Sequence, residues 1–215
     1  MPRQNDGAKI FQLKVTLADV KPAVWRRITV PGDIRLDELH MVLQAAMGWH
    51  DAHMHQFTFQ FKPKLPTRAQ LKKTRLNLRK IDLAEIRGVR VYSLPEFQLH
   101  DAEDESQVTL QELVSGPRAK FTYVYDFGDD WIHEIAVEKV GAPAKGGKPV
   151  QCLAGQGACP PEDSGGPHVY LDMVKALKNP KHPGHERAKH WLGKFNPAKF
   201  SRAEADRAVQ KSASD

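Results

Sequence analysis

The segment FTYVYDFGDDWIHEIAVEKV, residues 121–140, contains the clearest structural pattern in this 215-residue chain. Large side chains and one imidazole occupy every second position on both sides of its centre: Phe121, Tyr123, Tyr125, Trp131, His133, Ile135 and Val137. Alternation with period two is typical of a strand with one buried face, and the Gly128–Asp129 pair favours a turn between two strands. The segment therefore predicts a β-hairpin with a polar tip.

The rest of the chain predicts further strands before the hairpin and helices after it. Alternating runs at 11–17 and 24–30 indicate an antiparallel pair, 53–61 alternates again, and a weaker strand is expected near 89–92. An acidic loop is expected at 101–106. Helical spacing is predicted at 36–47, 108–114, 169–179, 185–193 and from Ser201 onward.

The ends of two helices are also predicted. Asp33 or a neighbour is the expected N-cap of the first helix, and Gly48 is its expected end. Ser201 and Glu204 form the capping-box sequence S-x-x-E at the start of the last helix.

Strands early and helices late predict an α+β fold. We expect a single domain with a mainly antiparallel sheet, helices packed on it and a helical C-terminal segment. This domain is predicted to span residues 1–200 with a basic insertion at 62–80, followed by a C-terminal helix and frayed tail at 201–215.

Composition limits the classes of function. The net charge of +6 and the pI of about 9.3 allow an anionic partner such as DNA without requiring one. The N-terminus lacks the apolar core of a signal peptide, and no apolar run reaches the roughly 18 residues of a membrane span. The sequence therefore predicts a cytoplasmic protein, in which cysteines are normally reduced.

Four histidines, His40, His53, His55 and His133, share helical or strand positions with apolar residues and are expected to face the core. Buried imidazoles need partners, because an unpaired buried polar group costs about 1–3 kcal/mol. One hypothesis is a zinc-type transition metal bound by Cys152, Cys159, His53, His55 and His133, with nearby carboxylates. The other is a hydrogen-bonded polar network. The candidate pocket comprises His40, His53, His55, Asp126, Asp129, Trp131, His133, Glu162 and Asp163.

The segment CLAGQGACPPEDSGGP, residues 152–167, holds both cysteines. Three interpretations are open: a disulfide, two reduced thiols packed as small apolar groups, or a pair of thiolate ligands. Gly165, Gly166 and Pro167 fit a turn into a helix with proline at its first position. Residues 159–163 are expected to lie beside the hairpin tip.

Residues 62–80 contain eight Lys or Arg and no acidic residue. This composition is typical either of a solvated loop or of an arm that contacts DNA phosphates without recognising bases. The candidate contacts are Lys72, Lys73, Arg75, Arg79 and Lys80.

Three blocks of the sequence, LHMVLQAAMGWHDAHMHQF, YVYDFGDDWIHEIAVE and CLAGQGACPPEDSGGPHVY, resemble the plasmid pRiA4b ORF-3-like family. The closing segment GHERAKHWLGKFNPAKFS is similar to the end of that family's pattern, whereas the insertion at 62–80 departs from it. The resemblance implies an α+β fold and a link to mobile elements. Family members are also labelled insertion-element passenger proteins of TnpR type, a label that suggests a resolvase. The chain has neither a serine among N-terminal arginines nor a His-x-x-Arg motif, so it does not support recombinase chemistry.

Two functions follow as hypotheses. The first is a mobile-element accessory or binding protein, associated with DNA through the basic arm. The second is a metal-assisted hydrolase or nuclease whose site lies among the histidines, aspartates and residues 159–163. The sequence does not distinguish a binding protein from an enzyme, nor does it indicate an oligomeric state.

Overall fold

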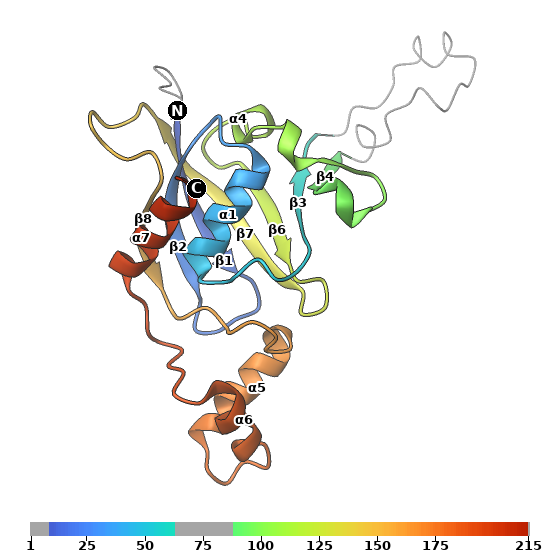
Figure 1. Ribbon diagram of the computed structural model, residues 1–215, viewed down its shortest axis with the longest axis vertical. Helices are drawn as coiled ribbons and strands as arrows, with labels where there is room; N and C mark the ends of the chain where they lie inside the picture. Colours follow the sequence, from blue (N-terminus) through green and yellow to red (C-terminus); the bar gives the residue numbers. More distant parts are fainter. Residues whose placement is uncertain (1–8, 63–87, 215) are drawn as a thin grey trace, which may run out of the picture.

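The fold is an eight-stranded sheet with helices beside it, described by a computed structural model that covers residues 9–62 and 88–214 (Figure 1). The strands are β1 (Ile10–Leu17), β2 (Trp25–Pro31), β3 (His55–Gln60), β4 (Val89–Ser93), β5 (Ala102–Asp104), β6 (Lys120–Tyr125), β7 (Trp131–Gly141) and β8 (Gln151–Gln156). Their order is β5-β4-β3-β6-β7-β1-β2-β8. All neighbours pair antiparallel except β4 and β5. The predicted α+β class is confirmed.

The predicted hairpin forms the centre of the sheet. β6 pairs with β7 so that Tyr123 lies opposite His133 and Tyr125 lies opposite Trp131. All four side chains are buried on the same face, as their alternation predicts. The hairpin therefore lines the core with both aromatic and titratable groups.

The opposite face of the sheet is polar. On β1, Leu13 and Val15 are fully buried, whereas Gln12 and Lys14 between them are not. On this second face Arg27 donates two hydrogen bonds to Glu138, at 2.6 and 2.8 Å. The Arg27 hydrogen bonds lower the pKa of the Glu138 carboxyl to about 2. One buried and one solvated face are usual for an antiparallel sheet.

Helices cover the apolar face and extend from one end of it. They are α1 (Leu36–Met47), α4 (Leu110–Leu113), α5 (Gly166–Lys178), α6 (His185–Leu192) and α7 (Arg202–Ser212). α1 and α7 contact each other in front of the sheet, and α7 also contacts β8 (Figure 1). α5 and α6 contact each other and lie beyond the end of the sheet. The side chain of Val209 on α7 is fully buried.

The predicted helix ends are partly confirmed. Gly48 ends α1 in a left-handed conformation with φ of 93°, as predicted. Arg35 rather than Asp33 is the N-cap of α1, and its backbone N–H donates to Glu38 at 3.0 Å. Ser201 caps α7 by accepting from the backbone N–H of Glu204 at 3.3 Å.

The connecting segments contain more strand than the sequence predicts. The acidic stretch 101–106 includes β5, whose three residues add to the sheet beside β4. The first residues of the 152–167 segment form β8, which pairs with β2 and places Cys152 in the core. Local composition conceals both strands, because pairing with a neighbour can outweigh the weak strand propensity of acidic residues and glycine.

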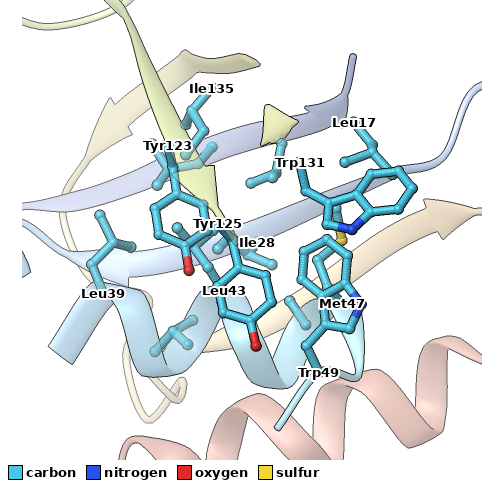
Figure 2. Packing of buried hydrophobic residues seen from close by; sticks show 14 of the residues in the cluster. Leu17, Ile28, Leu39, Leu43, Met47, Trp49, Tyr123, Tyr125, Trp131 and Ile135 are labelled. Atoms are coloured by element: carbon cyan, nitrogen blue, oxygen red, sulfur yellow. The ribbon is translucent and has the colours of Figure 1, made fainter. Parts of the chain in front are cut away.

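Aromatic side chains fill the core near the end of α1. Trp49 lies against Tyr125 with ring centroids 4.9 Å apart and against Trp131 at 6.0 Å (Figure 2). Tyr170 on α5 contacts Trp131 edge-on at 6.3 Å, so the helix pair is attached to the same core. No helix in the described part of the chain is long and apolar enough to cross a bilayer.

Candidate metal centre

Three loops meet at the end of the sheet where the hairpin turns. The first, residues 48–54, follows α1, the second is the hairpin turn 126–130, and the third, residues 157–165, joins β8 to α5. All three carry carboxylates or histidines. The site therefore depends on how these loops are held together.

Close backbone contacts hold the loops in place. The N–H of Gly165 donates to Asp129 Oδ2 at 2.8 Å, and the N–H of His50 donates to Glu162 Oε1 at 2.9 Å. A Cβ on Gly166 would collide with the backbone carbonyl of Asp129, so this contact requires glycine. The expectation that residues 159–163 lie beside the hairpin tip agrees with these contacts.

Side chains from the three loops converge on the Nε2 atom of His53. This atom lies 3.2 Å from Asp163 Oδ1, 3.6 Å from Asp126 Oδ2 and 4.0 Å from Glu162 Oε2. Within the described residues, neither His53 Nε2 nor Glu162 Oε2 has a hydrogen-bond partner, although both atoms are shielded from solvent. We call His53, Asp126, Glu162 and Asp163 the outer cluster.

The hairpin turn fixes the orientation of Asp126. Its Oδ1 atom accepts from the N–H groups of Gly128, at 3.0 Å, and Asp129, at 3.2 Å. The side chain thereby stabilises the turn while its second oxygen, Oδ2, faces His53. One Asp126 oxygen supports the fold, and the other is left for a ligand.

The two carboxylate oxygens of Glu162 also have different surroundings. Its Oε1 atom accepts from the backbone of His50 and from the hydroxyl of Tyr125, at 3.0 Å, while Oε2 is the oxygen nearest His53. The Tyr125 hydroxyl itself accepts from the N–H of Ala52 at 2.9 Å. Burial raises the pKa of Tyr125 above its ordinary value, so this hydroxyl keeps its proton and remains a donor at neutral pH.

Three members of the outer cluster, His53, Asp126 and Asp163, have the spacing of a coordination shell, because their ligand atoms all lie within 4.8 Å of one another. With metal–ligand distances of about 2.0–2.2 Å, two ligands of a tetrahedral ion lie roughly 3.4 Å apart. The separations from His53 Nε2 to Asp163 and Asp126, 3.2 and 3.6 Å, lie around this value, whereas Glu162 Oε2, at 4.0 Å from His53, does not belong to this group of three. The side chain of Asp163 is 67% exposed and that of His53 is 28% exposed, so one side is open to water.

A second group of polar side chains lies mostly in the core, with Asp51, whose side chain is 44% exposed, at its edge. We call it the inner cluster; it comprises His40, Gln44, Asp51, His55, Glu105, Tyr123 and His133. The rings of His40 and His55 stack with centroids 3.5 Å apart and an interplanar angle of 8°. His55 Nε2 lies 2.9 Å from Oε1 of Glu105, and both side chains are almost completely buried.

Both ring nitrogens of His40 have hydrogen-bond partners. Nδ1 lies 2.8 Å from the Tyr123 hydroxyl and Nε2 lies 2.9 Å from Asp51 Oδ1. Gln44 Nε2 donates to the Tyr123 hydroxyl at 2.9 Å. A consistent assignment has the Tyr123 O–H donating to Nδ1 of His40 and the Nε2–H donating to Asp51. The atoms of His40, Asp51 and His55 are close enough to share an ion. The two nitrogens of His40 are thus already paired, whereas His55 Nδ1 has no hydrogen-bond partner among the described residues.

Burial keeps two inner histidines neutral. Desolvation, with a smaller contribution from the adjacent His55, lowers the pKa of His40 to about 4. Desolvation also lowers the pKa of His133 to about 4. Nδ1 of His133 lies 3.3 Å from the carbonyl oxygen of Tyr123, so this nitrogen carries the proton.

The sequence profile of the plasmid pRiA4b ORF-3-like proteins matches residues 9–204, which include both clusters. The chain belongs to this family. It is 38% identical over 188 residues to the uncharacterized protein y4hQ of Sinorhizobium fredii (strain NBRC 101917 / NGR234), covering 86% of this chain and 82% of that protein.

A solved structure shares the pRiA4b ORF-3-like fold. The crystal structure of MM3350, a protein of unknown function from Methanosarcina mazei Go1, aligns with a TM-score of 0.73 and 27% identity. The alignment covers 92% of this chain and 97% of that one. The resemblance inferred from sequence is therefore confirmed, and the family consists of uncharacterised proteins.

In the pRiA4b ORF-3-like fold, the predicted site residues lie in different parts of the structure. His53, Asp126, Glu162 and Asp163 come together, whereas His40, His55 and His133 belong to the inner cluster. Trp131 lies in the apolar core, and Asp129 holds the loop before α5.

The cysteines lie apart from the other candidates. Both are free, and among residues 9–62 and 88–214 neither belongs to a group of three or more potential metal ligands. Burial raises the pKa of Cys159 well above its ordinary value, so this thiol is protonated. Of the three interpretations of the 152–167 segment, the structure agrees with reduced thiols.

His53 does not face the core as strand alternation predicts. β3 begins only at His55, so His53 lies in the preceding loop, where parity no longer determines direction. The five predicted nucleic-acid contacts, Lys72, Lys73, Arg75, Arg79 and Lys80, lie outside the described residues.

Sequence reasoning also missed several partners. Tyr123 and Tyr125 stand at inward positions of the hairpin, and this alternation could have identified them as buried hydroxyls in need of partners. Asp51 and Glu105 lie in a loop and in an acidic stretch, where the sequence does not distinguish them from solvated acids.

Proposed function

We propose that the protein binds one divalent transition-metal ion at the outer cluster and uses it to activate water for hydrolysis. The observation that supports this proposal is a group of three potential ligands, His53, Asp126 and Asp163, whose ligand atoms all lie within 4.8 Å of one another. The histidine nitrogen of this group has no hydrogen-bond partner among the described residues. Two carboxylate oxygens and an unprotonated imidazole nitrogen placed around one point repel each other unless a cation or a proton lies between them.

The donor set indicates which ions fit. One imidazole nitrogen and two carboxylate oxygens, from His53, Asp126 and Asp163, suit borderline or hard divalent ions such as Zn²⁺ or Mn²⁺. Such an ion leaves a position for water on the exposed side, near Asp163. Coordination to Zn²⁺ lowers the pKa of water to about 7, which supplies hydroxide at neutral pH.

Metal analysis tests the first half of the proposal. We expect protein purified without chelator to contain close to one equivalent of zinc or manganese by mass spectrometry, and His53→Ala to lose it. Loss of a ligand should weaken Zn²⁺ binding in calorimetry by at least about tenfold. His100→Ala is the matched control, because the His100 side chain is 93% exposed. Equal metal content in the wild type and His53→Ala would contradict the proposed site.

Hydrolysis is tested separately with chromogenic esters. We expect the zinc- or manganese-loaded protein to hydrolyse bis(p-nitrophenyl) phosphate, p-nitrophenyl phosphate or p-nitrophenyl acetate. EDTA should abolish turnover, the metal should restore it, and Asp126→Asn should lack it. Asp126→Asn keeps an oxygen that can accept from Gly128, so the turn is retained. A protein that binds metal but hydrolyses none of the three esters would overturn the hydrolytic half alone.

We also propose, from the sequence, that the basic insertion at 62–80 contacts DNA, consistent with an accessory role in mobile elements. Eight basic residues and no acid support an electrostatic contact with phosphates. Affinity for duplex DNA should fall steeply with salt, and replacing Lys72, Lys73, Arg75, Arg79 and Lys80 with Gln should flatten that dependence. Binding that does not change with salt would exclude this contact.

A further inference from the structure

A pocket of about 480 Å³ lies between the C-terminal end of α1, the N-terminal half of α7 and the segment that leads into α7. This volume is within the range of small-molecule sites. Small residues from α1 and α7, among them Ala46, Gly48, Ala205 and Ala208, form much of its wall. No residue of the outer cluster lines it.

Arg26 of β2 forms part of this pocket and is only 3% exposed. Its Nε donates to the carbonyl of Ala46 at 2.9 Å, and Nη1 donates to the carbonyls of Trp25, at 2.9 Å, and Gln156, at 3.1 Å. The ring of Phe200 lies over the guanidinium at 4.4 Å and fixes its plane. The group is therefore held rigidly in place.

The charge of Arg26 has no acidic partner in the described part of the chain. None of the ion pairs there includes it, and Nη2 makes no hydrogen bond to any described residue. A buried cation is costly unless an anion or hydrogen bonds compensate it, and here carbonyl oxygens supply only part of this compensation. Nη2 is thus a free donor on a buried residue that lines a cavity.

The rim of the pocket adds to this positive charge. Lys194 and Lys199 line it, and Glu204 is the one acidic side chain among the lining residues. The N-terminus of α7, which Ser201 caps, opens at the same place and contributes a further positive potential. The pocket combines a net positive field with apolar walls.

We propose that this pocket binds a small organic anion, with its carboxylate or phosphate group at Arg26 and its apolar body against the alanines and Phe200. A guanidinium whose plane is fixed suits a planar or tetrahedral oxyanion better than a mobile lysine does. The pocket is independent of the metal centre, so this proposal does not rest on the proposed function.

Binding is tested with three probes of similar shape on the full chain. Benzoate and phenyl phosphate carry the two anionic groups, and benzamide is the neutral match. We expect both anions to cause saturable shifts of the amide resonances of residues 45–48 and 201–205 at concentrations up to about 10 mM, and benzamide to bind at least tenfold more weakly. The tighter of the two anions identifies the carboxylate or the phosphate as the preferred group.

Two variants keep the test decisive if the buried arginine cannot be replaced. Arg26→Met should weaken anion binding at least tenfold. Lys199→Gln, at the rim, should weaken it severalfold without affecting the fold, and Ala208→Leu should block the pocket. Lys189→Gln is the control, because Lys189 is an exposed residue of α6 outside the pocket. No saturable shift with either anion, or equal binding of benzamide, would overturn the proposal.

Discussion

The inner and outer clusters contain the same kinds of residue but differ in how their atoms are paired. In the inner cluster each ring nitrogen of His40 and one of His55 has a hydrogen-bond partner at 2.8–2.9 Å. In the outer cluster His53 Nε2 faces three carboxylates and forms no hydrogen bond with a described residue. Unpaired atoms also occur in the inner cluster, where His55 Nδ1, Glu105 Oε2 and His133 Nε2 have no partner among the described residues. The clusters differ because the unpaired His53 Nε2 faces carboxylate oxygens, one of which belongs to a side chain that is 67% exposed.

The largest effect is expected from breaking the inner cluster. Glu105→Ala removes the partner of His55 and leaves a buried imidazole unpaired, which should lower the free energy of unfolding by up to about 3 kcal/mol. Urea denaturation at pH 7 measures this change. Glu103→Ala is the control, because its ion pair with Arg90 is exposed and should contribute less than about 1 kcal/mol. Equal effects of the two substitutions would remove the distinction between the buried pair and a surface pair.

The outer cluster should instead respond to metal. At a free Zn²⁺ concentration about 100 times the dissociation constant, we expect the wild type to gain roughly 2.7 kcal/mol of stability. Asp126→Asn should gain much less, while its stability without metal stays near that of the wild type. Denaturation with and without Zn²⁺ compares the two proteins. A similar gain in Asp126→Asn would show that zinc acts elsewhere.

Acid should destabilise the protein through the inner histidines. The pKa of His133 is about 4 in the folded chain and roughly 6.5 when unfolded, so the unfolded state binds more protons between these values. Stability should therefore fall by roughly 2 kcal/mol for this histidine as the pH drops from 6.5 to 5. His40 should add a similar loss.

A substitution isolates this contribution. The groups that face His133 are Tyr123, Trp49 and the charge of Arg26, which also lowers its pKa. His133→Phe should flatten the pH dependence of the unfolding free energy over the same interval. An unchanged slope would mean that His133 is not neutral in the native protein.

The smallest effect concerns the Tyr125 hydroxyl that orients Glu162. Tyr125→Phe removes the hydroxyl that holds Glu162 Oε1, so Zn²⁺ binding should weaken by about tenfold while the ligands remain. Calorimetric titration measures the affinity. Tyr170→Phe is a suitable comparison, because Tyr170 is buried and its ring packs against Trp131 and Phe195. An unchanged affinity in Tyr125→Phe would mean that the backbone of His50 alone orients Glu162.

The sequence predicts the sheet better than it predicts the site, for physical reasons. Alternation identifies which hairpin side chains are buried, because strand geometry is repetitive, and it correctly places Tyr123, Trp131 and His133. Loops have no such period. His53 and His55 look equivalent in sequence, but only His55 lies within a strand, so their side chains point to different environments.

The partners of both clusters were harder to predict than the clusters' histidines. Glu105 is one acid among several at 101–106. It becomes the partner of His55 only because the turn after β5 lies close to β3 in the folded chain. Glu162 is oriented by Tyr125, and nothing in the local sequence connects these two residues. Such pairings depend on tertiary structure.

The outer cluster also bears on how the chain folds. His50 and Glu162, whose hydrogen bond positions the cluster, are 112 positions apart in the sequence. Contacts of such long range form only after the loop-closure entropy of the intervening chain has been overcome, so they are expected late in folding. An ion held there would bind the completed sheet and not its partly assembled precursors, and its uptake would report the final step of folding.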